Sequence, residues 1–371
     1  MHRAGSGLAK GRAAASVAAM KFPLLPACGL LVAALAARAA APTPVVSTAA
    51  PYPKVGSIER LDPALDAVLA ADARVEKLAE GFRWAEGPVW RPREGDLVFT
   101  DVPANIAYRW REGEGVTVFL QPSGDTGATE RSSGEGANGL ALDAQGHLVL
   151  CQHGDRRVAR LAPDGSGFEV LAERWDGKRF NSPNDLCFDR AGALFFTDPP
   201  YGRGREATDE LGFHGVFRRA PDGTIALLHR ELDRPNGIAL SPDQKTLYVA
   251  NSGDRPGQRT FVVAFPLSAD GTVGPARVLF DATALLAAGR PGLMDGLKVD
   301  VHGNLWATGP GGVLILSAEG KHLGTVLTGT ATANCAFGGP DGGTLYITAN
   351  NQLLRVATRT KGDLGWRSDA R

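Results

Sequence analysis

The chain has 371 residues, of which 43% are hydrophobic and 22% are charged, a composition typical of soluble globular proteins. Its 40 Lys and Arg residues balance 40 Asp and Glu residues, so the formal net charge is zero. This balance argues against nucleic acid or an anionic membrane surface as the main partner. The length suits one large all-β domain or two ordinary domains.

Residues 1–41 are predicted to be a secretory signal peptide. Residues 22–41 are apolar and rich in Ala, and we expect translation to start at Met20, directly before this run. The alternative is a transmembrane anchor, for which the run is short and is interrupted by Pro26 and Arg38. We therefore expect export across the inner membrane to the periplasm, with no stable membrane insertion once the signal is removed.

A linker and one short helix are predicted to follow the signal. Residues 42–60 are rich in Pro, Ser and Thr, which is typical of a linker. Residues 61–73 contain Asp62 and Pro63 before an apolar run, the pattern of a capped helix with Pro in its first turn. Residues 74–78 have the pattern of a strand.

Six short stretches of the remaining chain share one pattern, in which a carboxylate or amide residue opens a mostly apolar, strand-like run. These stretches begin at Glu86, Asn138, Asn184, Asn236, Asp295 and Asn334. A unit repeated at this spacing indicates a solenoid, a propeller or another array.

The second repeat shows the content of one unit. Its strand-like runs, separated by turns rich in Asp and Gly, are residues 138–143, 147–151, 157–161 and 168–171. Four short antiparallel strands per unit are typical of a propeller blade. The sixth repeat lacks a fourth strand, and the strand predicted at residues 74–78 can supply it, which would leave no open edge.

The sequence therefore predicts an all-β fold over residues 74–360, followed by a C-terminal tail at residues 361–371. This fold is a six-bladed β-propeller with four-stranded antiparallel blades around a central metal-binding channel. Two insertions, residues 121–137 and 199–213, interrupt the regular spacing. The first should lie on the same face as Asn138, and such loops are often functional, although a merely solvated loop is the alternative.

The innermost strand of each blade lines the channel, so the six opening residues should surround one mouth of it. They are two carboxylates and four amides, without a thiolate or an imidazole. Such hard oxygen donors suit calcium, magnesium or manganese, and two carboxylates would neutralise a divalent cation. The alternative is that these residues only form turns and hydrogen-bond to their own backbone.

Three cysteines remain after the signal, so at least one thiol is unpaired. Cys151, Cys187 and Cys335 all lie in apolar runs, which favours buried free thiols. The sequence contains neither a Cys-x-x-Cys nor a His-Glu-x-x-His pattern, so it gives no sign of a thiolate or zincin-type metal site.

Residues 81–356 carry the motifs of a known family. The motifs, in chain order, are Glu86-Gly87-Pro88-Val89-Trp90, Asn181-Ser182-Pro183-Asn184-Asp185, Arg234-Pro235-Asn236-Gly237 and Met294-Asp295-Gly296. In this combination the chain resembles the gluconolactonase, regucalcin (senescence marker protein) and luciferin-regenerating-enzyme family. The second motif and the run from Thr197 to Gly202 are most similar to the bacterial gluconolactonases.

The resemblance implies a six-bladed propeller with one divalent cation in the channel. The residues that would hold the cation are Glu86, Asn184, Asn236 and Asp295. In some relatives the residue at the position of Asn184 contacts substrate rather than metal. Calcium is the first expectation, and magnesium, manganese and zinc are the alternatives.

The resemblance also implies hydrolysis of a sugar lactone, of the type glucono-1,5-lactone to gluconate. A metal-bound carbonyl would be polarised, and a carboxylate would activate the attacking water. Asp295 is the first candidate for this base and Asp185 the second, although Asp185 could instead be a turn residue. Asn138 and His153 are predicted to contact sugar hydroxyls, with a purely structural role as the alternative for His153.

Other functions remain open from the sequence. A propeller hydrolase of other lactones or esters, with paraoxonase-like substrates, would use the same site. A non-catalytic propeller that binds a partner through its loops would not need the carboxylates of Glu86 and Asp295 in its channel. A sugar dehydrogenase would need a basic and aromatic cluster for an anionic quinone, which the ring does not show. The sequence leaves the oligomeric state open.

Overall fold

The structure is a computed structural model that describes residues 44–46, 50–129, 132–204, 207–253, 255 and 257–363. The chain divides into two units, residues 1–40 and 41–371, and every element below lies in the second. The predicted signal peptide and residues 364–371 of the predicted tail lie outside the described residues. Among the residues that the structure describes, no helix has both the length and the apolar character needed to cross a membrane.

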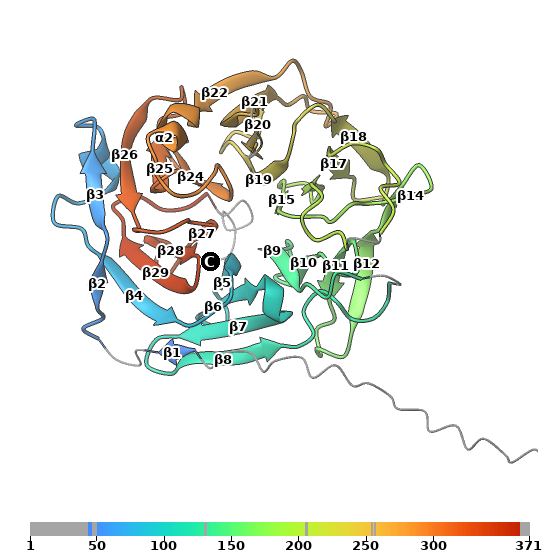
Figure 1. Cartoon of the computed structure of the whole chain (residues 1–371), viewed down its shortest axis with the longest axis horizontal. Coiled ribbons are helices and arrows are strands. Elements are labelled where there is room, and N and C mark those ends of the chain that lie inside the picture. Colours follow the sequence, from blue (N-terminus) through green and yellow to red (C-terminus); the bar gives the residue numbers. More distant parts are fainter. Residues whose placement is uncertain are drawn as a thin grey trace, which may run out of the picture. The chain divides into compact units, whose positions relative to one another are not determined.

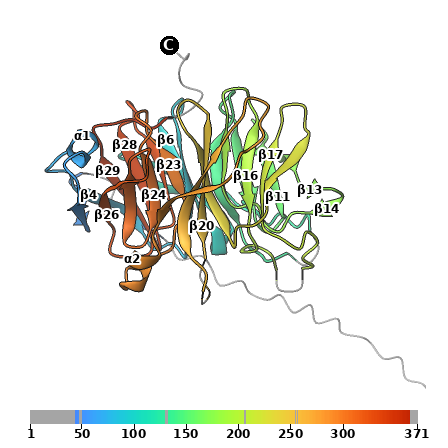
Figure 2. The same cartoon turned by 90° about the horizontal axis from the view of Figure 1, so that it is seen from above.

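Six antiparallel sheets of four to six strands are arranged around a common centre, which Figure 1 shows end-on and Figure 2 shows after a turn of 90°. The innermost strands, one from each blade, are β5 (Ala85–Arg91), β9 (Ala137–Leu142), β15 (Leu186–Phe188), β19 (Pro235–Leu240), β23 (Leu297–Val299) and β27 (Asn334–Gly338). The second strands are β6 (Asp96–Asp101), β10 (Leu148–Gln152), β16 (Leu194–Asp198), β20 (Thr246–Ser252), β24 (Leu305–Gly309) and β28 (Thr344–Ala349). The prediction of an all-β, six-bladed β-propeller is confirmed.

The outer half of each blade completes the sheet. The third strands are β7 (Ile106–Arg111), β11 (Arg157–Leu161), β17 (Gly215–Arg219), β21 (Thr260–Pro266), β25 (Gly312–Leu316) and β29 (Gln352–Ala357). The outer strands are β8 (Gly115–Leu120), β12 (Phe168–Ala172), β18 (Ile225–His229), β22 (Arg277–Asp281), β26 (His322–Leu327) and β4 (Val75–Glu80). The connections contain η1 (Val102–Ala104), α2 (Thr283–Ala287) and a small hairpin of β13 (Arg174–Trp175) and β14 (Lys178–Arg179).

The apolar core lies between blades rather than inside them. In β6, Leu97 and Phe99 pack against the sixth blade, while Val98 between them packs against the second. Side chains alternate between the two faces of a strand, so a continuous apolar run serves both neighbouring interfaces. Phe195 and Phe196 of β16 divide in the same way between the fourth and second blades.

The ring closes with a strand from the beginning of the propeller. β4 pairs antiparallel with β29, with Val75 opposite Val356 and Ala79 opposite Leu353. The last blade therefore has three strands from the end of the chain and one from residues 75–80. This confirms the closure that the missing fourth strand of the sixth repeat predicted.

The segment before β4 contains more strand than its composition predicts. Where a linker was predicted, β2 (Lys54–Val55) pairs with β4 and β3 (Ser57–Arg60) pairs with β26, and β1 (Val45–Val46) also pairs with β4. The exposed edges of two outer strands supply the backbone partners that the Pro-rich sequence does not itself indicate. The predicted helix is shorter than expected, because α1 covers only Leu65–Val68.

Candidate metal and substrate site

The six opening residues lie at one end of the innermost strands. Glu86, Asn138 and Asn236 are the second residues of their strands, and Asn334 is the first residue of β27. Asn184 and Asp295 come two residues before β15 and β23. All of them except Asp295 are nearly inaccessible to solvent, and Glu86 and Asn184 are each only 2% exposed.

Asn184 and Asp295 are each held by a backbone hydrogen bond from a neighbouring blade, and glycine makes the close approach possible. The Gly139 N–H donates to the carbonyl oxygen of Asn184 at 2.7 Å, and the Gly237 N–H donates to that of Asp295 at 3.0 Å. A Cβ at Gly139 or Gly237 would lie 2.6 or 2.3 Å from the same oxygens. This close contact explains why two of the openings read Asn-Gly.

Threonines on the second strands make a further contact between blades. The hydroxyl of Thr100 donates to the Asn138 carbonyl at 3.0 Å, and that of Thr197 donates to the Asn236 carbonyl at 2.6 Å. The Thr197 hydroxyl also accepts a hydrogen bond from the Asp185 N–H at 3.2 Å. One side chain therefore fixes the backbone of two site segments on adjacent blades.

Replacing Thr197 with Val is expected to lower the free energy of unfolding by ~1–3 kcal/mol, because two buried backbone groups lose their partner. The isosteric methyl group keeps the volume of the side chain, so the loss reports the hydrogen bonds. Urea unfolding followed by circular dichroism measures it. Thr117→Val, on the exposed outer strand β8, is the matched control. Equal stability of the two variants would contradict this role for Thr197.

The acidic side chains of the ring are close enough to perturb one another. Burial raises the pKa of Glu86 to about 7, and the negative charge of Asp185 adds to the shift. Burial also raises the pKa of Asp295 well above its usual range, and the negative charges of Glu86 and Asp185 add to this shift. The three carboxyl groups therefore repel one another in the protein alone, a repulsion that a bound cation would relieve.

Glu86 is expected to make the metal-free protein less stable as the pH rises. Its pKa is 4.5 in an unfolded chain and about 7 in the folded protein, so the folded state binds more protons between these values. The stabilising contribution is present below pH 4.5 and is lost as the pH rises through 7. In EDTA, the difference in Tm between pH 5 and pH 8 should be larger for the wild type than for Glu86→Gln. Equal differences would contradict the shift.

The amide residues supply oxygens without partners. The Oδ1 atoms of Asn184 and Asn138 are buried and accept no hydrogen bond from the described residues. In that same part of the chain, no three His, Cys, Asp or Glu side chains are grouped so that they could hold a metal by themselves. A cation at this mouth would therefore need amide oxygens together with the carboxylates of Glu86 and Asp295, and the unpartnered Asn184 oxygen fits that need.

Asp185 and Asn334 hydrogen-bond to each other within the ring. Asp185 is 1% exposed, its Oδ1 accepts the Leu186 N–H at 2.9 Å, and its Oδ2 accepts from the Asn334 amide at 3.4 Å. The Asn334 side chain also hydrogen-bonds to Glu86. The ammonium group of Lys298 is 3.6 Å from Asp185 Oδ2 and 3.5 Å from Asn334 Oδ1. Both oxygens of Asp185 are thus engaged within the protein.

The two inserted loops meet at His153, directly after β10. His153 is 1% exposed, its Nδ1 is 3.3 Å from Oε2 of Glu135 in the first insertion, and its Nε2 has no partner among the described residues. Gly202 of the second insertion lies against the ring, since a Cβ there would be 2.2 Å from the His153 Cβ. The buried, unpartnered nitrogen makes His153 a candidate ligand-binding group rather than a satisfied structural histidine.

Tyr201 brings a phenol from the second insertion towards Asp295. Burial raises the pKa of Tyr201 to about 12, with the charge of Asp295 as the next cause. The guanidinium carbon of Arg234 lies 5.3 Å from the centre of the Tyr201 ring. Tyr201 therefore remains protonated over the whole physiological pH range and can donate a hydrogen bond.

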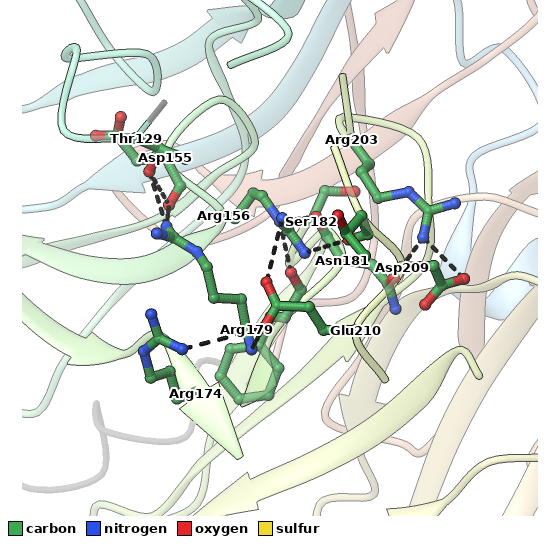
Figure 3. Close-up of polar contacts among 12 residues, drawn as sticks. Thr129, Asp155, Arg156, Arg174, Arg179, Asn181, Ser182, Arg203, Asp209 and Glu210 are labelled. Carbon is green, nitrogen blue, oxygen red and sulfur yellow. Dashed lines mark hydrogen bonds and ion pairs between the residues drawn. The ribbon is translucent and has the colours of Figure 1, made fainter. Parts of the chain in front are cut away.

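Figure 3 shows a network of arginines that connects the two insertions to residues 179–182, which lie just before Asn184. Arg156 donates to the carbonyl oxygens of Phe180 at 2.7 Å and Asn181 at 3.1 Å, and Arg203 donates to Asn181 Oδ1 at 3.0 Å. Arg179 points the other way and donates to Thr129 Oγ1 at 2.8 Å. The residues just before Asn184 are therefore held between the first and second insertions.

Asp198 completes this support from inside the same blade. Its carboxylate accepts the N–H groups of Asn181 and Ser182, each at 2.8 Å. Asp101 makes the equivalent contact in the first blade, where it accepts the N–H groups of Arg83 at 3.0 Å and Trp84 at 3.2 Å. The Thr-Asp pair that ends the second strand thus positions the entry to the innermost strand in both blades.

A family model described as "SMP-30/Gluconolactonase/LRE-like region" matches residues 84–351, which is most of the propeller. The chain belongs to this family. A gluconolactonase of Zymomonas mobilis is 39% identical over 318 residues, which cover 83% of this chain and 88% of the relative. The predicted resemblance, including that to bacterial gluconolactonases, is confirmed.

Two further proteins are similar to this chain to different degrees. A pentonolactonase of Haloferax volcanii is 28% identical over 271 residues, covering 72% of this chain and 81% of the relative. The solved structure of a gluconolactonase from Xanthomonas campestris has a TM-score of 0.71 and 35% sequence identity, and covers 82% of this chain and 97% of that chain.

Family motifs did not point to every residue of the site. Glu135, Tyr201 and Lys298 were not predicted, because the first two lie in insertions whose course a repeat pattern does not define. A sequence signal did exist for Lys298. Val89, Ala141, Cys187, Ala239 and Lys298 each come three residues after an opening residue, and Ala336, two residues after Asn334, lines the same cavity. One cation among small apolar residues at a channel-lining position marks a departure that the repeats themselves reveal.

Proposed function

We propose that this protein is a divalent-metal-dependent lactonase that hydrolyses sugar lactones of the glucono-1,5-lactone type to aldonates. One observation carries the proposal. Glu86, which is buried, and Asp295, which is partly buried, come from two different blades, and the charge of Glu86 helps to raise the pKa of Asp295. Buried acids of this kind are typical of functional sites, and the 39% identity to a gluconolactonase supports the reaction class.

The proposed cation ligands are Glu86, Asn184, Asn236 and Asp295. Calcium is the first candidate for an all-oxygen set, and magnesium, manganese and zinc are the alternatives. A divalent cation bound there would polarise the lactone carbonyl and stabilise the negative charge that develops on its oxygen.

Asp295 is the proposed general base. It keeps some solvent-accessible surface at the mouth, whereas Asp185 is 1% exposed and has both oxygens occupied. Asp295 would accept a proton from water as the water oxygen bonds to the carbonyl carbon. The ring C–O bond then breaks and the alkoxide is protonated, which gives the hydroxy acid.

Asn138, Asn184 and His153 are the proposed contacts to the sugar hydroxyls. The first two have unpartnered buried Oδ1 atoms that can accept from a hydroxyl, and the unpartnered Nε2 of His153 can serve as a third contact. Tyr201, which stays protonated, can donate to a substrate oxygen. A ring of several fixed polar groups suits a polyhydroxylated lactone better than an apolar ester.

We also propose that the protein is exported to the periplasm. An apolar N-terminal segment of signal type at residues 1–41 supports export to the periplasm. Fractionation of cells that express the full chain, with immunoblotting of periplasmic and cytoplasmic fractions, tests it. A processed band in the periplasmic fraction is expected, and an unprocessed cytoplasmic band would contradict export.

A substrate panel tests the proposed function. The purified protein is assayed on glucono-1,5-lactone, a pentonolactone, a simple aliphatic lactone and paraoxon, before and after EDTA and with each of the four metals restored. Hydrolysis of the sugar lactones that EDTA removes and a metal restores is expected. Preference for the aliphatic lactone or paraoxon would reassign the substrate. The absence of hydrolysis with every metal would contradict the proposed lactonase activity.

A further inference from the structure

Lys298 has an unusual position in the channel. It is the middle residue of β23, and the equivalent residues of the other innermost strands are small and apolar, as with Ala141 and Ala239. Its ammonium group crosses from the fifth blade to Asp185 of the third, at 3.6 Å from Oδ2. The small neighbours leave the space that a four-carbon side chain needs for this reach.

The contacts of this ammonium group are all within the ring. Besides Asp185, it donates to the Leu297 carbonyl at 3.0 Å and lies 3.5 Å from Asn334 Oδ1. Asn334 in turn donates to Asp185 and hydrogen-bonds to Glu86. Lys298, Asn334 and Asp185 therefore form one polar unit that borders the candidate ligand Glu86 without including any of the four proposed ligands.

A cavity of about 320 Å³ adjoins this unit. It is lined by Lys298, by apolar residues of the innermost strands such as Leu140 and Phe337, and by charged residues that include Asp189 and Arg190. Lys298 thus stands between the acidic mouth and a part of the channel in which the innermost strands contribute mostly apolar residues. Charges at such a boundary act on one another more strongly than in water.

We propose that Lys298 is a positioning residue that sets the charge of the metal site, by neutralising Asp185 so that the ring as a whole matches one divalent cation. The proposal rests on the proposed function. Glu86, Asp185 and Asp295 carry three negative charges when ionised, and the ammonium group reduces the total to minus two. Without Lys298 the third carboxylate would be uncompensated, and without Asp185 the ammonium would repel the metal.

Calorimetric titration of metal-stripped protein with Ca²⁺ and with Mn²⁺, at pH 8 and 0.1 M salt, tests the proposal through affinity rather than activity. Lys298→Met is expected to tighten metal binding at least ~10-fold, and Asp185→Asn is expected to weaken it at least ~10-fold. The double variant should return to within about threefold of the wild type. A loss of packing alone would weaken binding in both single variants.

The controls separate charge from structure. Lys298→Arg keeps the charge and should bind metal within about fivefold of the wild type, and Lys245→Met removes an exposed charge far from the ring and should leave affinity unchanged. Thermal melting by circular dichroism checks that each variant is folded.

Each outcome bears on a different claim. Single variants that shift affinity in the same direction, or a double variant weaker than both, would overturn the role of Lys298. If one single variant does not fold, the other single variant and the double variant still decide, because the charge account requires the first to shift affinity in its stated direction and the second to restore it. A wild type that binds neither metal would instead contradict the proposed function.

Discussion

Replacing Asp295 with Asn is expected to reduce kcat/KM for glucono-1,5-lactone by at least ~10³-fold. The substitution removes a charged metal ligand and the proposed general base together, and a general base alone contributes roughly 10²–10⁴-fold. Asn has nearly the same size as Asp, so the loss reports charge rather than volume. Initial rates of acid release, corrected for spontaneous hydrolysis, measure the effect.

Asp101→Asn is the matched control for this variant. Asp101 is also a buried acid near the start of an innermost strand, but its oxygens accept backbone N–H groups of Arg83 and Trp84. The control should lower Tm, yet keep kcat/KM within about threefold of the wild type. If Asp295→Asn retains a tenth or more of the wild-type value, Asp295 is neither the base nor an essential ligand.

A chain that begins at Gly81 is expected to lose cooperative folding altogether. This truncation removes β4, whose Val75, Leu78 and Ala79 are at most 2% exposed and which supplies the fourth strand of the sixth blade. Each large apolar side chain contributes ~1.5–3 kcal/mol and each ladder hydrogen bond ~0.5–1.5 kcal/mol. The total is comparable to the ~5–15 kcal/mol that stabilises a typical domain.

A chain that begins at Asp62 provides the comparison, because it lacks β1, β2 and β3 but keeps α1 and β4. It should unfold cooperatively with a modestly lower Tm, and a synthetic peptide of residues 72–82 should restore folding to the shorter chain. Calorimetry of both chains distinguishes the outcomes. A cooperative transition for the chain from Gly81 alone would show that closure by β4 is not required.

The sequence was sufficient to predict the blades because their signal is local and repeated. Runs such as Leu97-Val98-Phe99 alternate between two apolar interfaces, and turns rich in Asp and Gly separate them. Closure followed from counting strands, since the sixth repeat was one short and residues 74–78 were unassigned. The short strands β2 and β3 could not be predicted, because their pairing depends on edges supplied by β4 and β26.

The repeats were sufficient to predict the opening residues of the site but not the contacts between distant segments. Glu86, Asn138, Asn236 and Asn334 occur at equivalent positions, so one blade predicts the others. His153 and its partner Glu135 come from different segments that only the fold brings together. The same holds for Lys298 and Asp185, whose contact crosses the channel between two blades that are not adjacent. Sequence order contains no information about contacts of this kind without a model of the ring.

The measurement that tests the central claim most directly is an anomalous difference map from crystals of the protein grown with Mn²⁺. The account predicts one strong peak per chain, bonded to oxygens of Glu86, Asn184, Asn236 and Asp295, and its absence in crystals of Glu86→Gln. A peak at other residues, or no peak in a protein that still hydrolyses glucono-1,5-lactone, would contradict the account.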